Sequence, residues 1–395
     1  MTERPTVKLR PKIDARKFRF GFPWIYQDQL VLDRRSRNIP AGSLVDVVDG
    51  EGRALGVWAF NAASKITCRS VDLKTHDIDA AWFSEVLSRA AAHRDALFDA
   101  PFYRLIHAEA DGCPGLIIDR FGDVFVVQPN AAWVEMRFPA LVEALIALFD
   151  PKAIVKNAQG RARKLEGLDE GIEVVHGVID DVIDVPMNGA IYQADVLGGQ
   201  KTGLFFDQRP NHAMFQKISQ GADVLDVFSH VGGFSLAALA GGASTALAVD
   251  ASDAALGLAA DGARKMGKAE AFETRKGDAF DVMAKLREEG RMFDAVVCDP
   301  PAFAPQKPAL EAGLRAYERV ARLGAALVKP GGYLCLCSCS HAADLTKFRE
   351  ASLRGIGKAG RKGQIFHEGG AGPDHPVHPQ LAESAYLKSI FLRLF

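Results

Sequence analysis

Long hydrophobic runs are missing from the 395-residue sequence, and no stretch is long enough to span a lipid bilayer. The first residues, MTERPTVKLRPKIDARKF, are charged and lack the apolar core of a secretory signal peptide. Net charge is also nearly absent, at −1, so the chain as a whole has no electrostatic field directed at a polyanion. We therefore expect a soluble, cytoplasmic protein without a membrane partner.

Cysteine is scarce, with six residues, of which three stand on alternate positions in CLCSCSHA, residues 335–342. So few cysteines without a framework spacing are typical of free thiols in a reducing compartment. Three cysteines along one strand do not converge on a tetrahedral centre, and no second Cys/His cluster stands near them, so we expect no metal site. Cys335 and Cys337 are predicted to be small buried residues of an apolar strand.

The length predicts two or three domains. Residues 44–71 show short apolar runs broken by glycine turns, as in a small β-barrel, and residues 79–98 show helical periodicity, which places a boundary near residue 75. Residues 1–37 hold ten Lys/Arg against four Asp/Glu. This excess fits a phosphate-contacting surface, and a merely solvated face is the alternative.

The middle of the chain reads as an α+β unit. Two β-rich runs in GLIIDRFGDVFVVQPN precede a predicted helix over residues 132–149, and AIVKNAQ, IEVVHG and AIYQADV follow as strands. From about residue 223, apolar strands alternate with helices, which predicts an α/β, doubly wound, mostly parallel Rossmann-like sheet. Ligands of such sheets bind at the carboxyl ends of the strands. The tail AYLKSIFLRLF is predicted to be a final strand that closes the sheet.

A strand, a glycine turn and a helix follow one another in DVFSHVGGFS. The spacing fails the G-x-G-x-x-G pattern, which favours another adenosine-containing ligand over a dinucleotide. Asp226, Asp250 and Asp278 are expected at three successive strand ends. Their negative charges suit the sulfonium and ammonium groups of S-adenosylmethionine (SAM) and would repel a pyrophosphate. The alternative is that each aspartate serves a turn or a helix cap.

Two further segments carry the predicted chemistry. In CDPPAFAPQ, Pro300 and Pro301 stiffen the loop that follows Asp299, and a flat base could lie against Phe303. Cys339 ends the strand before a predicted helix with Ser340 as N-cap, and the N–H groups of that helix would lower the pKa of the thiol. Neighbouring strands would bring Asp299 and Cys339 together. A thiolate that adds to C6 of a pyrimidine makes C5 nucleophilic enough to take a methyl group.

The motifs DVFSHVGGFS, AVDAS, GDAF, DPPAF and CSCSH, with GQKTGLFFDQRPNH upstream and HPQLAESAYLKSIFLRLF at the end, resemble the RlmI-type ribosomal RNA cytosine-5 methyltransferases over essentially the whole chain. The resemblance implies a PUA-like RNA-binding domain (1–73), a linker helix with an EEHEE α+β domain (74–195) and a class I methyltransferase domain (196–395). It implies SAM as cofactor and large-subunit (23S) ribosomal RNA as partner. A homodimer stays open.

Site residues follow by position. The resemblance implies Cys339 as the nucleophile and Asp299 as the residue that faces the base. The expected cofactor-binding residues are Asp207, Gln208, Arg209, Asp226, Phe228, Ser229, Gly232, Gly233, Asp250, Ala251, Ser252, Asp278, Ala279 and Asp299, and the expected substrate-binding residues are Pro300, Pro301 and Phe303. Other RNA cytosine-5 methyltransferases carry a second cysteine after the motif-four proline, where this chain has Ala302. Cys298 is expected to be a core residue.

Three alternatives remain open at this point. An exocyclic amine could be methylated directly, because Asp-Pro-Pro with a nearby aromatic residue also suits N6 or N4 transfer. Guanine N7 could be the target on the same scaffold, which would leave the thiol idle. The chain could instead be a non-catalytic RNA-binding assembly factor with a vestigial SAM pocket.

Overall fold

The computed structural model of the protein describes residues 4–74, 77–179, 182–199 and 203–395. The chain folds into two compact units, which are described separately here. The first unit consists of Met1–Asp181, Val196–Thr202 and Asp374–Ser384, and the second of Val182–Asp195, Gly203–Pro373 and Ala385–Phe395. The expected boundary near residue 75 lies outside the described residues. The three-domain division stays a prediction.

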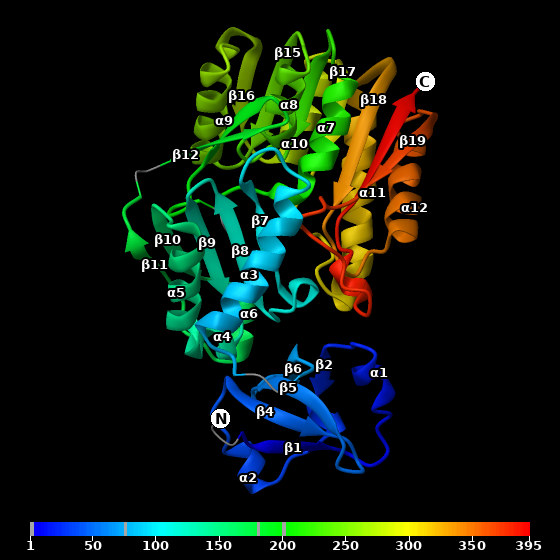
Figure 1. The fold of residues 1–395 in the computed structure, drawn as a ribbon. Helices are drawn as coiled ribbons and strands as arrows, with labels where there is room; N and C mark the ends of the chain where they lie inside the picture. Colours follow the sequence, from blue (N-terminus) through cyan, green and yellow to red (C-terminus); the bar gives the residue numbers. More distant parts are fainter. Residues whose placement is uncertain (1–3, 75–76, 180–181, 200–202) are drawn as a thin grey trace. The chain divides into compact units, whose positions relative to one another are not determined.

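A six-stranded sheet begins the first unit, in the order β2-β6-β5-β4-β1-β3 (Figure 1). Its strands are β1 (Thr6–Leu9), β2 (Trp24–Tyr26), β3 (Leu30–Val31), β4 (Ser43–Val48), β5 (Ala54–Phe60) and β6 (Ile66–Asp72), with short helices α1 (Arg16–Arg19) and α2 (Arg34–Arg37). The predicted strand, glycine turn and strand are β4 and β5, which pair antiparallel. Trp58 is fully buried and meets Phe18 edge to face at 5.9 Å, so this sheet has its own aromatic core.

The predicted connecting helix is α3 (Ala80–Asp95), which Asp79 caps by accepting from the N–H of Trp82 at 3.0 Å. A five-stranded sheet follows in the order β11-β10-β9-β8-β7. Its elements are β7 (Phe102–His107), β8 (Leu116–Phe121), β9 (Val124–Pro129), α4 (Ala132–Met136), α5 (Phe138–Phe149), β10 (Ala153–Ala158), α6 (Arg161–Glu166) and β11 (Gly171–Gly177). The single helix predicted over residues 132–149 is two, because Pro139 cannot donate to the turn before it.

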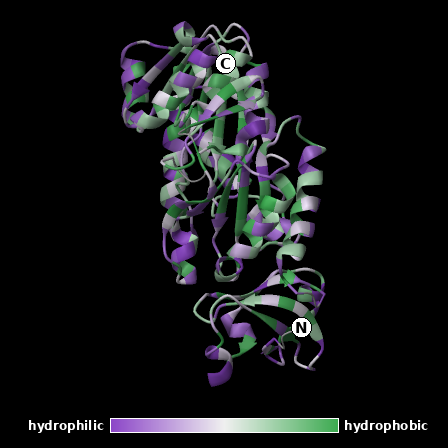
Figure 2. Cartoon of the chain, turned by 60° about the vertical axis from the view of Figure 1, so that its left-hand side comes forward, coloured by the Kyte–Doolittle hydropathy of each residue, from purple (hydrophilic) through white to green (hydrophobic). Residues whose placement is uncertain are grey.

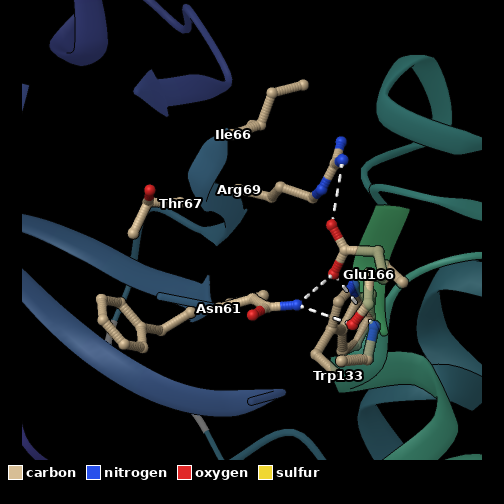
Figure 3. Close-up of a pocket in the computed structure, with 10 residues that line it drawn as sticks. Asn61, Ile66, Thr67, Arg69, Trp133 and Glu166 are labelled. Atoms are coloured by element: carbon tan, nitrogen blue, oxygen red, sulfur yellow. Dashed lines mark hydrogen bonds and ion pairs between the residues drawn. The ribbon is translucent and has the colours of Figure 1, made fainter. Parts of the chain in front are cut away.

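Polar side chains in the first unit line a small buried hollow (Figure 3). Glu166 accepts from Nδ2 of Asn61 at 3.0 Å and pairs with Arg69 at 3.5 Å. Arg69 also pairs with Glu109 at 3.0 Å, so the guanidinium is shared between two carboxylates. The cavity beside them has a volume of about 10 Å³, which is room for one water molecule at most. The polar residues around this hollow therefore stabilise the fold, and the hollow itself is too small to be a ligand pocket.

The second unit holds a seven-stranded sheet in the order β16-β15-β14-β17-β18-β20-β19, and β20 is antiparallel to both of its neighbours. The strands are β14 (Asp223–Val227), β15 (Thr245–Asp250), β16 (Phe272–Lys276), β17 (Phe293–Cys298), β18 (Val328–Ser338), β19 (Gly363–Gly369) and β20 (Lys388–Leu394). The helices are α7 (Arg209–Lys217), α8 (Gly233–Ala240), α9 (Asp253–Lys265), α10 (Ala279–Glu288), α11 (Leu310–Leu327) and α12 (Leu345–Lys358). The predicted doubly wound, mostly parallel sheet is confirmed.

Side chains of each strand alternate between two helical layers. Leu225 and Val227 of β14 join a core cluster with residues of α10, α11 and α12, whereas Asp226 between them reaches α8. The inner strands β14 and β17 are almost wholly buried, as expected for a sheet covered on both faces, whereas the outer strands β16 and β19 carry exposed polar residues. Figure 2 shows green segments mixed with white and purple ones along the chain. Among the described helices, none combines the length and the apolar content needed to cross a membrane.

Two strands differ from the sequence expectation. The C-terminal strand β20 does not close the sheet, because it lies between β18 and β19, and β19 is the edge (Figure 1). AIYQA forms β13 (Ala190–Ala194), which pairs with β12 (Ile183–Met187) and belongs to the second unit rather than to the five-stranded sheet. The place of β20 depends on long-range pairing, which local periodicity does not specify. β12 and β13 form a local hairpin across Asn188-Gly189, and it is the packing of this hairpin against α9 that assigns it to the second unit.

Candidate active site

The glycine turn between β14 and α8 is backbone-strained. Phe228 (φ 65°), His230 (φ 49°) and Gly232 (φ 81°) all adopt left-handed conformations. Such conformations are uncommon for residues other than glycine, and they persist where the surrounding structure enforces them, often at ligand sites. The predicted nucleotide loop is thus formed by two strained side-chain-bearing residues as well as by glycine.

Two of the predicted aspartates hold this loop in place. Asp226 is 1% exposed and accepts from the N–H of Ser235 at 2.8 Å, and burial raises the pKa of its carboxyl to about 6. Asp250 accepts from the N–H of His230 at 2.9 Å and from the N–H of Ser252 at 2.8 Å. Asp250 therefore ties the loop after β14 to the loop after β15, side by side at the carboxyl edge of the sheet.

Gly233 is needed for space, because a Cβ there would lie 2.8 Å from Nε2 of His212. His212 is buried, which lowers the pKa of its imidazole to about 3 and leaves the ring neutral. The neutral ring packs edge to face on Phe234 at 4.5 Å. The start of α8 therefore comes closer to α7 than any residue with a side chain would allow.

The third aspartate is placed differently from the prediction. β16 ends at Lys276, so Asp278 is not a strand-end residue. It is exposed and caps α10, accepting from the N–H of Phe280 at 2.9 Å and of Asp281 at 3.2 Å. The capping alternative is thus correct for this position, and a contact of Asp278 or Ala279 with an adenine stays a prediction.

A buried chain of hydrogen bonds ends at Asp299. Ser389 donates to Oδ1 of Asn211 at 2.8 Å, Nδ2 of Asn211 donates to Oε1 of Gln208 at 2.6 Å, and Nε2 of Gln208 donates to Oδ2 of Asp299 at 2.8 Å. Asn211 and Ser389 are 0% exposed and Gln208 is 4% exposed. The structure therefore brings Gln208 and Asp299 together, as their shared place in the predicted site requires, and fixes the orientation of the Gln208 amide.

Next to this chain, Asp207 carries an unsatisfied buried oxygen. Tyr386 donates to its Oδ2 at 2.6 Å, and its backbone carbonyl accepts from the N–H of Gly372 at 2.9 Å. Within the described part of the chain, Oδ1 of Asp207 and the hydroxyl of Ser229 have no hydrogen-bond partner. Most buried polar groups are paired, so these two call for an explanation, and a bound ligand would supply one. A carboxylate oxygen and a hydroxyl suit the ammonium and hydroxyl groups of SAM.

Cys339 lies partly exposed directly after β18, whose end is next to the end of β17 and Asp299. The serines on either side, Ser338 and Ser340, are 0% exposed. Both bond to the phenol of Tyr317, at 2.9 and 2.7 Å, so the cysteine stands between two residues that are anchored inside. The cysteine-bearing turn is therefore fixed while its thiol keeps access to solvent.

The predicted helix N-terminus at Cys339 is wrong. Helix α12 begins at Leu345, and its N-cap is Asp344, which accepts from the N–H of Lys347 at 2.9 Å. Ser340 cannot cap this helix because its hydroxyl is occupied elsewhere, accepting from the N–H of Ala304 at 2.9 Å. The helix dipole therefore does not explain how the thiol of Cys339 could be activated.

The other cysteines match their predicted roles. Cys298, Cys335 and Cys337 are at most 1% exposed, and burial raises the pKa of each thiol. The sulfurs of Cys335 and Cys337 lie 3.8 Å apart on one face of β18. Among the described residues, no group of three or more His, Cys, Asp or Glu side chains could hold a metal ion. These thiols are core residues, as expected for the strand.

Phe303 is half-buried in an aromatic cluster. Its ring centroid lies 5.1 Å from that of Tyr317, 6.2 Å from Phe280 and 6.4 Å from Phe228. These rings include the loop residue Phe228 of the predicted cofactor site. These contacts place Phe303 beside the predicted cofactor loop. Its role in stacking on a base, and the substrate contacts of Pro300 and Pro301, stay predictions.

Four residues near the site were missed by the sequence interpretation. They are Asn211 and Tyr386, Lys388 and Ser389, all of which bond to the segments described above. The signal for two of them was present in AYLKSIFLRLF, because a lysine and a serine at the start of a strand buried in the sheet need polar partners. Residues 200–202 of the upstream motif lie outside the described residues.

Comparison with known proteins agrees with this architecture. Residues 145–359 match the family model of S-adenosylmethionine-dependent methyltransferases, and residues 7–72 match that of PUA-like domains. The ribosomal RNA large subunit methyltransferase I of Vibrio vulnificus is 33% identical over 393 residues, covering 97% of this chain and 96% of that protein. A ribosomal RNA large subunit methyltransferase of Deinococcus radiodurans is also 33% identical and covers 99% of this chain and 98% of its own length.

Solved structures share the fold. A protein from Streptococcus mutans assigned as a SAM-dependent methyltransferase superposes with a TM-score of 0.82 at 18% identity and covers 98% of this chain and 100% of its own. A second structure, of a protein assigned as a methyltransferase and solved in complex with SAH, superposes with a TM-score of 0.83 at 19% identity. It covers 99% of this chain and 100% of its own. The cofactor is SAM, as the matched family model states. The chain belongs to the family of ribosomal RNA large subunit methyltransferases, SAM-dependent enzymes with a PUA-like domain.

Proposed function

We propose that this protein methylates carbon 5 of a cytosine in large-subunit ribosomal RNA, with Cys339 as the nucleophile. The names of its curated relatives support the substrate class. The observation that carries the chemical proposal is the partly exposed thiol of Cys339 at the carboxyl edge of the sheet, beside the strand that leads into Asp299. Cys335 and Cys337 on the strand are buried, so Cys339 is the cysteine of this segment that a base could reach.

The thiol answers a chemical need, because C5 of cytosine is a weak nucleophile. The Cys339 thiolate forms a bond to C6, and the electron pair of the C5–C6 double bond moves to C5. SAM, when bound, supplies an electrophilic methyl group that C5 can take. A base then removes the C5 proton, the electron pair of that bond restores the double bond, and the thiolate leaves C6 with the pair of the S–C6 bond.

Asp299 is proposed to bind the edge of the cytosine that carries N3 and N4. The carboxylate is oriented by the amide of Gln208 at 2.8 Å, and Gln208 is held in turn by Asn211. A carboxylate fixed in this way can accept from the exocyclic amine and stabilise the charge that develops as the thiolate adds. We also propose that SAM binds along this carboxyl edge of the sheet. It would contact Asp207 and Arg209, Phe228 and Gly232, and the loop after Asp250.

Bisulfite mapping of ribosomal RNA tests the proposal. RNA from cells without the protein should lose one protected cytosine of the large subunit, and expression of the unaltered protein should restore it. C339S should fail to restore it, while C335S, at a buried cysteine of β18 four positions before Cys339, should restore it. Restored protection by C339S would refute the covalent step and favour transfer to an exocyclic amine.

Three coarser proposals accompany this one. We propose that the protein acts in the cytosol, where its ribosomal substrate is made and thiols stay reduced. A homodimer and the three-domain division at residues 73 and 195 are also proposals. Size-exclusion chromatography with light scattering tests the first of these two, and limited proteolysis tests the second.

A further inference from the structure

The buried lysine at the start of β20 has no role in the mechanism described so far. Lys388 is 8% exposed, and its ammonium donates to the backbone carbonyl of Ser340 at 2.6 Å and to that of Ala343 at 2.8 Å. Both carbonyls belong to the turn that directly follows Cys339. Burying a charged group is costly unless it makes such bonds, so the lysine is held there by this turn and holds it in return.

Alternation along β20 explains how one strand reaches both sides of the site. Lys388, Ile390 and Leu392 alternate along β20, so their side chains lie on the same face of the strand, and Ile390 and Leu392 pack in the cluster with α11 and α12. Ser389 points to the opposite face and bonds to Asn211. The strand therefore supports the Cys339 turn with one residue and the chain that ends at Asp299 with the next.

We propose that Lys388 is a positioning residue for Cys339: its buried ammonium fixes the turn after the cysteine and favours the anionic form of the thiol. This inference rests on the nucleophilic role proposed for Cys339. It replaces the helix N-terminus that the sequence predicted, because α12 begins six residues after the cysteine. A buried positive charge supports a thiolate in the same way as a helix dipole does.

The charges around the two groups support this assignment. Burial lowers the pKa of Lys388 to about 8, while the nearby Cys339 and Asp344 oppose that shift, so the ammonium is mostly charged at neutral pH. Among the described residues, titratable groups near this turn include Tyr317 on α11, His341 on the turn itself and Tyr386, whose ring lies 5.6 Å from that of His341. Asp299 follows β17, the strand that pairs with β18.

The carboxylates among these groups disfavour a second negative charge. Asp344 is partly compensated, because its pKa is lowered mainly by a hydrogen bond from Lys347. The phenol of Tyr317 stays neutral, since burial raises its pKa. Lys388 therefore supplies a positive charge that is buried against the Cys339 turn and favours the thiolate.

The pH dependence of alkylation at Cys339 tests the proposal without RNA. The other five cysteines are at most 1% exposed, so iodoacetamide should label Cys339 first, and peptide mass spectrometry gives the rate at each pH. In the unaltered protein the midpoint should lie below the value of about 8.5 for a free cysteine. A midpoint at or above that value would overturn the inference, whether or not any variant folds.

Variants then separate charge from packing. K388M should raise the midpoint by about one pH unit, the effect expected for losing an opposite charge nearby, and slow alkylation at pH 7 about tenfold. K388R should stay within threefold of the unaltered protein, because it keeps the charge. K347M, which removes an exposed positive charge next to the same turn, should change the rate less than twofold.

An unchanged midpoint in K388M, or equal shifts in K388M and K388R, would refute the inference. Its failure is separable from that of the proposed function. If the midpoint depends on Lys388 but bisulfite protection of the ribosomal RNA is the same with and without the protein, the cytosine-5 reaction is refuted and the positioning role of Lys388 remains. Lost protection in C339S with no dependence on Lys388 would do the reverse.

Discussion

Replacing Gln208 with glutamate tests the buried hydrogen-bond chain directly. The Nε2 group of Gln208 that donates to Asp299 at 2.8 Å becomes an oxygen, so two carboxylates face each other across that distance. At an effective dielectric constant of 20, two unit charges this far apart repel by about 6 kcal/mol, equivalent to about four pKa units. Water reaches the partly exposed Asp299 and screens this repulsion, so we expect the pair to retain one proton up to an apparent pKa of about 6 to 8.

The sign of the pH dependence follows from this raised pKa. Below it, the shared proton bridges the two carboxyls and the hydrogen bond is kept. As pH rises from the unfolded glutamate value of about 4.3 through the pKa of the pair, the folded protein must give up the proton and stability is lost. A shift of two to four units corresponds to about 3 to 5 kcal/mol of lost stability at pH 9 relative to pH 5.

Urea denaturation between pH 5 and 9 measures the effect. The difference in unfolding free energy between Q208E and the unaltered protein should grow with pH, and SAM affinity measured by calorimetry should fall in parallel. Q364E is the matched control, because Gln364 is exposed on β19 and its difference should stay within about 0.5 kcal/mol. A Q208E difference that does not change with pH would refute the assigned contact with Asp299.

Three further changes probe the loop and the turn. In G233A the new methyl group would lie 2.8 Å from Nε2 of His212, so overpacking of about 1 to 3 kcal/mol should weaken SAM binding at least tenfold by calorimetry, whereas G357A, which meets nothing within 4 Å, should bind normally. Because burial raises the pKa of Asp226 to about 6, its ionisation costs stability as pH rises from about 4 to 6. D226N should therefore gain about 2 kcal/mol relative to the unaltered protein between pH 4.5 and 7.5, and equal differences in urea denaturation at both pH values would contradict this. S340A leaves the buried N–H of Ala304 without its acceptor and leaves the phenol of Tyr317 bonded to Ser338 alone, so thermal and urea unfolding should show a loss of about 1 to 3 kcal/mol, and an unchanged stability would exclude the anchoring role.

Much of the second unit could be predicted because its signals are local. Apolar runs specified β14, β15, β17 and β18, and helical periodicity specified the helices after β14 and β15, whereas the polar strand β16 carries no such signal. The carboxyl edge followed from the rule for doubly wound sheets. The buried cysteines of β18 were also predictable, since an apolar strand in such a sheet is covered on both faces. Family motifs extended this to SAM and to the ribosomal methyltransferases.

The sequence by itself therefore determined the fold class and the cofactor, and it predicted the segments that meet at the candidate site. Only the tertiary structure decided how those segments are joined. The start of α12 depends on which residue between Cys339 and Leu345 has a hydroxyl or carboxylate to spare, and Ser340 had already bonded to Ala304 and Tyr317. Lys388 became a neighbour of Cys339 because β20 inserts beside β18, and strand pairing across 49 residues is set by the packing of the whole sheet rather than by local pattern.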